Sequence, residues 1–564
     1  MTSDAVVLDG YVDEPACLGV PPYIAPQPRS LAGVLREHGY RVAYHTIDQL
    51  RKDPPLLLSL DAADLVVMVA GVTVPGKYLA GTPATLKEVE QVGSTLRHPR
   101  TFLAGPILFG YSAGGGKRAV RREIAGFSAF LEGSPAGALD SCLSGGEPRG
   151  DGDYRRLSEW LVAGAPVIRE HPSFPHLMCE LETATGCSRA VSGGCSFCTE
   201  PFYGPPRFRT PGEVAAEVAA LSANGARHFR LGRQPDLLTF GATGGEFPRP
   251  DPGKIRDLFA GVRQAAPGLL TLHIDNVNPG TIARHEEASR EALRAIVGGH
   301  TPGDVAAFGM ETADPAVVGA NNLKATPEQA MEAIRVVNEE GGMRREGIPE
   351  LLPGLNFVIG LAGETGETFR LNREFLQKVL AEGLLVRRVN IRKLMAFPGT
   401  KAYQENTLGR HDRLFRAFKE QVRKDFDRPM ISRVFPLGTV LRRVIVEVEG
   451  GISYARQMGS YPVLVGIPLQ VPAGTVLDMV VVDWGMRSLT ALPYPVEVNR
   501  LPARALAWIP GIGKKRAAAL AAARPLPDLA AFRRVAGENP LEGALSFRAP
   551  RPPGAPSPSE HRSG

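Results

Sequence analysis

Three of the six cysteines lie in one glycine-rich loop, "GCSRAVSGGCSFCTEP" (residues 186–201). Cys195 and Cys198 form a C-x2-C step, and seven residues separate Cys187 from Cys195. Thiolates at C-x2-C spacing bind zinc or iron–sulfur clusters, and ligand softness alone does not distinguish the two. A structural zinc ion prefers four closed ligands, and no histidine lies inside this loop. Three cysteine ligands and an open position are therefore typical of a catalytic metal centre rather than a structural one.

The composition is that of a soluble protein with several domains. A chain of 564 residues is too long for one core, and 43% hydrophobic with 22% charged residues is ordinary for globular proteins. No uncharged apolar run reaches the roughly 18 residues of a transmembrane helix. The start, "MTSDAVVLDGYVDEP", lacks the regions of a signal peptide. We therefore expect a cytoplasmic protein whose clustered cysteines serve metal binding or catalysis rather than disulfide formation.

Alternating strand-like and helix-like segments predict two successive α/β domains. Residues 1–165 have this rhythm, which indicates a doubly wound sheet. Residues 166–432 contain six apolar runs, each followed by a helix-like segment, and capping boxes at Thr210 and Thr326 mark two helix starts. These features predict a partial TIM barrel, (β/α)6, with function on the loops after its strands and the cysteine loop after the first. The six runs are "HLMCELETATG", "ARHFRLG", "LLTLHIDN", "VAAFGMET", "GLNFVIGL" and "VRRVNIRKL".

The C-terminal part of the chain changes character twice. Residues 433–498 are rich in β-branched residues, with Gly and Pro at short intervals, which predicts a small all-β barrel. Residues 499–536 are helical around "IPGIGKKRAAALAAA". The Pro- and Ser-rich tail, residues 537–564, is expected to be disordered.

The cysteine loop and the later strands resemble the radical S-adenosylmethionine (radical SAM) superfamily of iron–sulfur oxidoreductases. The loop follows the first barrel strand and has an aromatic residue, Phe197, before its last cysteine. "RLGRQPD", "FGMETADPAVVGANNLKAT", "NFVIGLAGETGETF" and "VNIRKLMAFPGTKAY" resemble the second, fourth, fifth and sixth strand segments of that superfamily. The usual motif is C-x3-C-x2-C, whereas this chain has C-x7-C-x2-C. Longer first gaps occur in some members, and extra loop residues cost only a fraction of a kcal/mol in closure entropy.

The resemblance implies both a cofactor set and a mechanism. Cys187, Cys195 and Cys198 would hold a 4Fe–4S cluster whose open iron binds S-adenosylmethionine. An electron from a donor such as flavodoxin or ferredoxin would cleave the sulfonium and give a 5′-deoxyadenosyl radical, which abstracts hydrogen from the substrate. The resemblance also implies cofactor-binding residues at the adenine, at the second strand, at the fourth strand and at the last two strands, namely Phe197, Gly232, Glu311, Asn356 and Arg392.

The C-terminal modules indicate that the protein binds RNA. "VEGGISYARQMGSYPVLVGIP" resembles a TRAM domain, the small barrel that ends radical methylthiotransferases acting on RNA. "IPGIGKKRAAAL" resembles a helix-hairpin-helix, in which backbone N–H groups meet a phosphate. Residues 499–536 carry eight Lys or Arg and one Asp, a balance of +7 against +6 for the whole chain. The predicted nucleic-acid contacts are Gly511, Gly513, Lys514, Lys515 and Arg516, with tRNA as the expected partner.

The N-terminal domain resembles both the methylthiotransferase N-terminal domain and the cobalamin-binding domain of other radical enzymes. Cys17, Cys142 and Cys179 are widely separated, and no D-x-H-x-x-G motif occurs, so neither a second cluster nor cobalamin is assigned or excluded. Two alternatives stay open beside RNA modification. The enzyme could act on DNA or a small molecule, or the chain could be a non-catalytic iron–sulfur protein that binds RNA.

Overall fold

The computed structural model describes a chain that folds into two compact units. The described residues are 4–14, 17–71, 81–97, 100–112, 114–150 and 152–548. The first unit contains residues 1–345, 349–430 and 458–461, and the second contains 346–348, 431–457 and the residues from 462 onward. The N-terminal α/β domain and the (β/α)6 barrel, expected to meet at residue 165, therefore belong to one compact unit.

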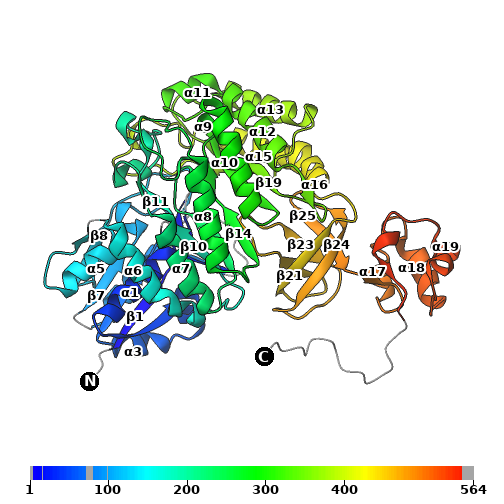
Figure 1. Cartoon of the computed structure of the whole chain (residues 1–564), viewed down its shortest axis with the longest axis horizontal. Helices are drawn as coiled ribbons and strands as arrows, with labels where there is room; N and C mark the ends of the chain where they lie inside the picture. Colours follow the sequence, from blue (N-terminus) through cyan, green and yellow to red (C-terminus); the bar gives the residue numbers. More distant parts are fainter. Residues whose placement is uncertain are drawn as a thin grey trace. The chain divides into compact units, whose positions relative to one another are not determined.

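The N-terminal part of the first unit is a six-stranded sheet with the strand order β5-β1-β6-β7-β8-β9 (Figure 1). All its neighbouring strands are parallel, which confirms the doubly wound α/β prediction. Alternate side chains such as Val6 and Leu8 are buried in its apolar core. The strands are β1 (Asp4–Asp9), β5 (Arg41–Thr46), β6 (Leu65–Val69), β7 (Thr101–Ala104), β8 (Ala129–Gly133) and β9 (Arg149–Gly150).

Two glycines bring α1 (Pro26–Glu37) and α6 (Tyr154–Gly164) into direct backbone contact. A Cβ at Gly33 would lie 1.9 Å from the Trp160 carbonyl oxygen, and a Cβ at Gly164 would lie 1.8 Å from that of Arg29. Any larger residue at either position would push the helices apart. The close packing places the buried guanidinium of Arg29 in an ion pair with a buried carboxylate of the barrel, Glu217. The sheet domain is therefore joined to the barrel through a buried charge pair.

The rest of the first unit contains all six predicted barrel strands, each parallel to its neighbours, which confirms the partial TIM-barrel prediction. They form two four-stranded sheets, β14-β13-β10-β4 and β15-β16-β19-β20. The short β4 (Tyr23–Ile24) comes from the N-terminal part of the chain and extends the first of these sheets. The other strands are β10 (Met178–Glu182), β13 (His228–Gly232), β14 (Thr271–Ile274), β15 (Asn276–Val277), β16 (Asp304–Glu311), β19 (Leu351–Ile359) and β20 (Arg388–Lys393).

Helices follow the barrel strands in the predicted order (Figure 1). Both predicted capping boxes form, with Thr210 accepting from the backbone N–H of Glu213 and Thr326 accepting from that of Gln329. Among all described helices, none combines the length and the apolar character needed to span a membrane. The main barrel helices are α7 (Pro211–Ala223), α8 (Pro252–Ala265), α10 (Glu286–Gly299), α12 (Pro327–Gly341), α13 (Gly366–Ala381) and α15 (Asp412–Val422).

The second unit contains a closed five-stranded barrel, in the order β21-β22-β23-β25-β24, which confirms the all-β prediction. Three short helices follow, α17 (Ala503–Leu506), α18 (Gly513–Ala522) and α19 (Leu529–Ala536). Apolar residues of the barrel and of the helices share one core, with Val480, Leu520 and Phe532 buried in it. The barrel strands are β21 (Val440–Val448), β22 (Ser453–Arg456), β23 (Leu464–Ile467), β24 (Val476–Trp484) and β25 (Ser488–Pro493).

The segment expected to begin a disordered tail at residue 537 is folded as far as residue 548. Leu541 and Ala544 are buried in the core of the second unit, and β27 (Leu545–Ser546) pairs with β26 (Val496–Glu497). The composition of residues 550–564 dominates the sequence pattern of this region and hides the apolar residues that precede them. Residues 549–564 lie outside the described part of the chain.

Candidate functional site

The cysteine loop leaves the barrel directly after β10, the first strand of the predicted series. Cys187 precedes a short 3-10 helix (Ser188–Ser192), and the backbone N–H of Cys187 donates to the Gly204 carbonyl at 3.0 Å. Gly194 ends the turn with φ +67°, and a Cβ there would lie 2.6 Å from the Pro201 ring. The loop is therefore folded back on itself, which brings its first cysteine toward the other two.

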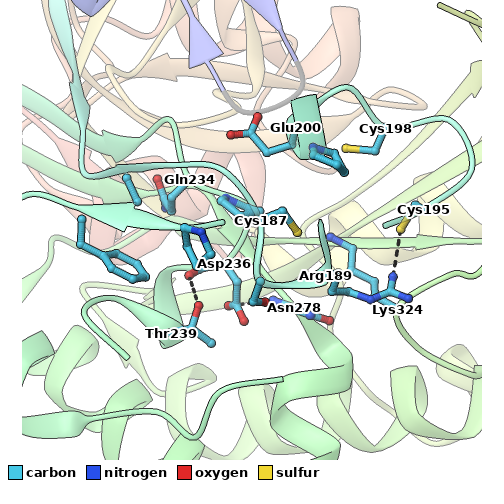
Figure 2. A pocket seen from close by; sticks show the side chains of 16 residues that line it. Cys187, Arg189, Cys195, Cys198, Glu200, Gln234, Asp236, Thr239, Asn278 and Lys324 are labelled. Atoms are coloured by element: carbon cyan, nitrogen blue, oxygen red, sulfur yellow. Dashed lines mark hydrogen bonds between the residues drawn. The ribbon is translucent and has the colours of Figure 1, made fainter. Parts of the chain in front are cut away.

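All three cysteines line one pocket beside the barrel strands (Figure 2). The loops after β13 and β15 supply polar side chains to its wall, and a lysine from the segment after β16 completes it. In addition to the cysteines, the polar and charged lining residues are Ser188, Arg189, Glu200, Gln234, Asp236, Thr239, Asn278 and Lys324. The pocket thus combines soft sulfur ligands with groups that can bind a polar cofactor.

Burial keeps the three cysteines in the neutral thiol form when no metal is bound. Desolvation is the largest effect on each, and it raises the pKa of Cys187, Cys195 and Cys198. Burial by itself would lower the pKa of Lys324, but Glu311 and the thiolate forms of the neighbouring cysteines outweigh it and raise that pKa. Metal ligation removes the thiol protons outright, so these groups suit a bound metal cluster with a buried cation beside it.

The donor set fits a multi-iron cluster. Within the described ranges, no three His, Cys, Asp or Glu side chains are arranged around a single metal ion. A 4Fe–4S cluster has no such requirement, since each of its thiolate ligands binds a different iron. Three half-buried cysteines in one pocket, with polar groups beside them, would leave the fourth iron for a non-protein ligand.

Glu311 lies beside the pocket at the end of β16, in a left-handed conformation with φ +65°. An added Cβ at Gly309 would lie 2.6 Å from Glu311 Oε1 and 2.9 Å from Lys324 Nζ, so the two charged ends meet over Gly309. Burial raises the pKa of Glu311 to about 7, although the nearby Lys324 and Arg392 act in the opposite direction. Glu311 therefore interacts electrostatically with Cys195, Lys324 and Arg392, and the roles of Glu311 and Arg392 as cofactor contacts stay predictions.

Two other predicted cofactor contacts, Phe197 and Asn356, have different surroundings. Phe197 packs against an apolar cluster that includes Leu323 and Leu361. Asn356 of β19 accepts a hydrogen bond from the side-chain amide of Asn390 on β20, at 3.1 Å. Asn356 is not among the pocket-lining residues, so its role as a cofactor contact stays a prediction.

Gly232, expected to allow close approach of a cofactor, has another reason to be glycine. It is the last residue of β13, and a Cβ there would lie 1.8 Å from Oε1 of the buried Glu180. That carboxylate is fixed by an ion pair with Arg230. The packing of Glu180 accounts for the glycine without any bound ligand.

The Gly232→Ala variant is therefore expected to lose stability even without a cofactor. The new methyl group forces Glu180 or the strand to move, which costs about 1–3 kcal/mol, as overpacking does in other cores. Thermal unfolding of the cofactor-free protein would show a lower midpoint. Gly212→Ala is the control, because nothing lies within 4 Å of a Cβ at that position. Equal unfolding midpoints for the two variants would contradict the packing explanation and leave cofactor binding as the reason for a glycine at position 232.

Sequence reasoning missed several charged residues of the pocket. Arg189 and Lys324 carry no recognisable motif, although both lie in segments that the superfamily resemblance already covered. Asp236 comes four residues after the end of β13, and its carboxylate accepts from the Asn278 backbone at 3.1 Å and from the Thr281 hydroxyl at 2.7 Å. An acidic residue in the loop that follows a barrel strand is the sequence signal that could have identified Asp236.

Cys142 and Cys179 are not among the pocket-lining residues. Cys142 lies in α5 (Pro135–Leu143) of the sheet domain. Cys179 lies on β10, fully buried, where desolvation raises its pKa to about 12. The side chain of Cys17 lies outside the described part of the chain. No assignment of a second cluster or of cobalamin follows from these positions.

The predicted nucleic-acid contacts are exposed at the start of α18. Gly511 and Gly513 have φ values of +75° and +56°, which few residues other than glycine adopt. Lys514, Lys515 and Arg516 are exposed in the first turn. Arg516 Nη1 donates to the Gly511 carbonyl at 2.9 Å, which braces the glycine turn.

Comparison with known proteins identifies relatives at two levels of similarity. A protein of Archaeoglobus fulgidus described as an "Uncharacterized protein" is 43% identical over 511 residues, covering 90% of this chain and 93% of that protein. The ribosomal protein uS12 methylthiotransferase RimO of Geobacter sulfurreducens is 27% identical over 255 residues, covering 41% and 50%. The tRNA-2-methylthio-N(6)-dimethylallyladenosine synthase of Sorangium cellulosum is 26% identical over 202 residues, covering 34% and 37%.

The family model of the radical SAM superfamily matches residues 181–376. That region begins in β10, contains the whole cysteine loop and ends in α13, so it includes the pocket and most of the barrel. The superfamily resemblance inferred from the cysteine spacing and strand segments is therefore confirmed. The chain belongs to the radical SAM superfamily of enzymes, which use a 4Fe–4S cluster together with S-adenosylmethionine.

Proposed function

We propose that this enzyme modifies a nucleotide in RNA, with tRNA as its substrate, and that Cys187, Cys195 and Cys198 hold its cluster. The observation that carries the ligand assignment is the gathering of these three half-buried cysteines in one pocket at the end of the first barrel strand. Each thiol is held neutral by burial, so ligation to iron is the state in which it can carry charge there.

The surrounding residues would bind and orient S-adenosylmethionine. The bound cluster supplies the electron that cleaves S-adenosylmethionine into methionine and a 5′-deoxyadenosyl radical, which takes a hydrogen atom from the substrate. Lys324 provides a buried positive charge for a carboxylate, and Glu311 offers an acceptor for the cofactor's amino group or ribose hydroxyls. Phe197, on the apolar side of the loop, would pack near the adenine, with Arg392 as a further polar contact.

Two features support RNA as the substrate. The closed five-stranded barrel of the second unit corresponds to the segment that resembles a TRAM domain, and the helices after it carry the +7 balance. The exposed cations of α18 follow a glycine turn whose backbone can approach a phosphate closely, as a helix-hairpin-helix requires. The similarity to a tRNA methylthio synthase favours tRNA among RNA substrates.

Nucleoside mass spectrometry tests this proposal. Bulk tRNA from a deletion strain is expected to lack one modified nucleoside that the wild-type strain contains. The wild-type gene should restore that nucleoside, and a gene encoding Cys195→Ala should not, because it removes a sulfur that the cluster needs. Identical nucleoside profiles in the wild-type and deletion strains would contradict tRNA as the substrate, while leaving the cluster assignment to be tested on the purified protein.

A further inference from the structure

The long first gap of the cysteine motif brings one arginine to the cluster ligands. Seven residues, 188–194, separate Cys187 from Cys195, instead of the usual three. Residues 191–193 at the middle of this segment are exposed to solvent, and Val191 is 76% exposed. Arg189, by contrast, has only 4% exposure. The loop therefore exposes its middle and sends one charged side chain inward.

The guanidinium of Arg189 contacts the second cysteine directly (Figure 2). Arg189 Nη1 donates to Cys195 Sγ at 3.2 Å. Its Nε donates to Glu246 Oε1 at 2.7 Å, and its Nη2 donates to Asn322 Oδ1 at 3.0 Å. Three nitrogen atoms thus have three different partners, and the planar guanidinium is fixed in one orientation.

The two anchors of Arg189 come from outside the loop and hold the loop itself. Glu246 also accepts from the Ser192 hydroxyl at 2.8 Å. The amide of Asn322 donates to the Gly194 carbonyl at 2.9 Å. The same contacts that close the long loop therefore aim Arg189 at Cys195, so the sulfur contact is part of a built arrangement.

We propose that Arg189 raises the reduction potential of the cluster by donating a hydrogen bond to Cys195 and by placing positive charge beside it. The inference rests on the proposed function, because it takes Cys195 as a cluster ligand. One-electron reduction, by a donor of the flavodoxin or ferredoxin class, adds one negative charge to the cluster. Hydrogen bonds to the sulfurs and nearby charge set iron–sulfur potentials, and both favour the reduced form here. Burial limits the screening of this interaction by water.

Glu246 offsets part of the charge but not the hydrogen bond. Its carboxylate pairs with the Nε side of the guanidinium, whereas Nη1 faces the sulfur. Glu246 is also about one third exposed, so water screens it more than the buried Arg189. The cluster side of this ion pair is therefore positive.

Potentiometric titration monitored by EPR tests the proposal on the reconstituted full-length protein. Arg189→Met is expected to lower the ratio of reduced to oxidised cluster about tenfold at a given potential, equivalent to about 59 mV for a one-electron couple. Arg284→Met is the matched control. Arg284 lies over the same Phe247 ring as Arg189, at 3.7 Å against 5.4 Å, but donates to the Gly280 carbonyl. The reduction potential of the cluster in Arg284→Met should equal that of the wild type.

A second measurement detects Arg189 beside the cluster directly in the wild-type protein. Wild-type protein labelled with 15N-arginine should show, in pulsed ENDOR of the reduced cluster, a nitrogen coupling that Arg189→Lys removes. Absence of that coupling, an unchanged potential in fully loaded Arg189→Met, or an equal shift in Arg284→Met would each overturn the role of Arg189. Those results leave the cluster ligands intact, whereas reconstituted wild-type protein without a cluster would overturn the ligand assignment as well.

Discussion

The triple variant Cys187→Ala, Cys195→Ala, Cys198→Ala is expected to bind no cluster and to release no 5′-deoxyadenosine. Anaerobically reconstituted wild-type protein should contain about four irons per chain, because each chain would hold one 4Fe–4S cluster. With dithionite and S-adenosylmethionine, it should release 5′-deoxyadenosine slowly even without substrate. Among the described residues that line the pocket, these three supply the thiols, and alanine at each position removes all of them. Iron content, visible absorbance and chromatography of the products measure the loss.

Cys142→Ala is the matched control for this prediction. It removes a free thiol of the sheet domain that is not among the pocket-lining residues, so iron content and product release should stay at the wild-type level. Methionine should form with 5′-deoxyadenosine in equal amounts, which excludes simple hydrolysis of the cofactor. The cysteine assignment is wrong if the triple variant keeps the iron and absorbance of the wild type.

The elements that the sequence predicts well are those that depend on neighbouring residues. Each of the six barrel strands is a short apolar run followed by a helix, and both properties are local. The capping boxes at Thr210 and Thr326 are also local, because the cap and its partner are three residues apart. Since the cysteine loop follows the first of these strands, its place at the carboxyl end of the barrel follows from the strand order alone.

Contacts between distant segments cannot be predicted from the sequence in this way. The segment Met458–Tyr461 belongs to the first unit, although the strands on either side of it belong to the small barrel. Tyr461 donates to the buried Asp275 at 2.8 Å, and the Ser460 hydroxyl donates to the Ile274 carbonyl at 3.0 Å. Such a contact depends on nearly two hundred intervening residues, and no periodicity within the segment indicates it.

The pocket shows the same division. The three cysteines that line it could be predicted because their spacing has a chemical meaning. Arg189 and Lys324 could not, since a buried cation is defined by the groups around it. The pKa of Lys324 is raised by the cysteines and Glu311, which are brought to it only by folding. Gly232 shows the reverse case, in which a residue matches the expected pattern but the packing of Glu180 explains it.

Alanine at Lys514, Lys515 and Arg516 together is expected to weaken RNA binding about uniformly across sequences. The three side chains are exposed beside the Gly511–Gly513 turn, where they can neutralise phosphates but do not read bases. Each lost phosphate contact should make the slope of log K against log salt shallower by roughly 0.7 for a single strand, or about 0.9 for a duplex. Three lost contacts therefore reduce the slope by about two. Fluorescence anisotropy with labelled tRNA over a series of salt concentrations measures both effects.

The comparison variant removes the same charge from another surface. Lys117, Arg121 and Arg122 are exposed cations of the sheet domain, and alanine at all three gives the same change in net charge. If the α18 cations bind phosphate directly, only their loss should change the salt slope, whereas a general effect of net charge would change both variants equally. Release of 5′-deoxyadenosine without substrate should survive in the α18 variant, because these residues are not part of the cysteine pocket. An unchanged affinity and slope would instead make the glycine turn a structural cap of the second unit, and RNA would have to bind elsewhere.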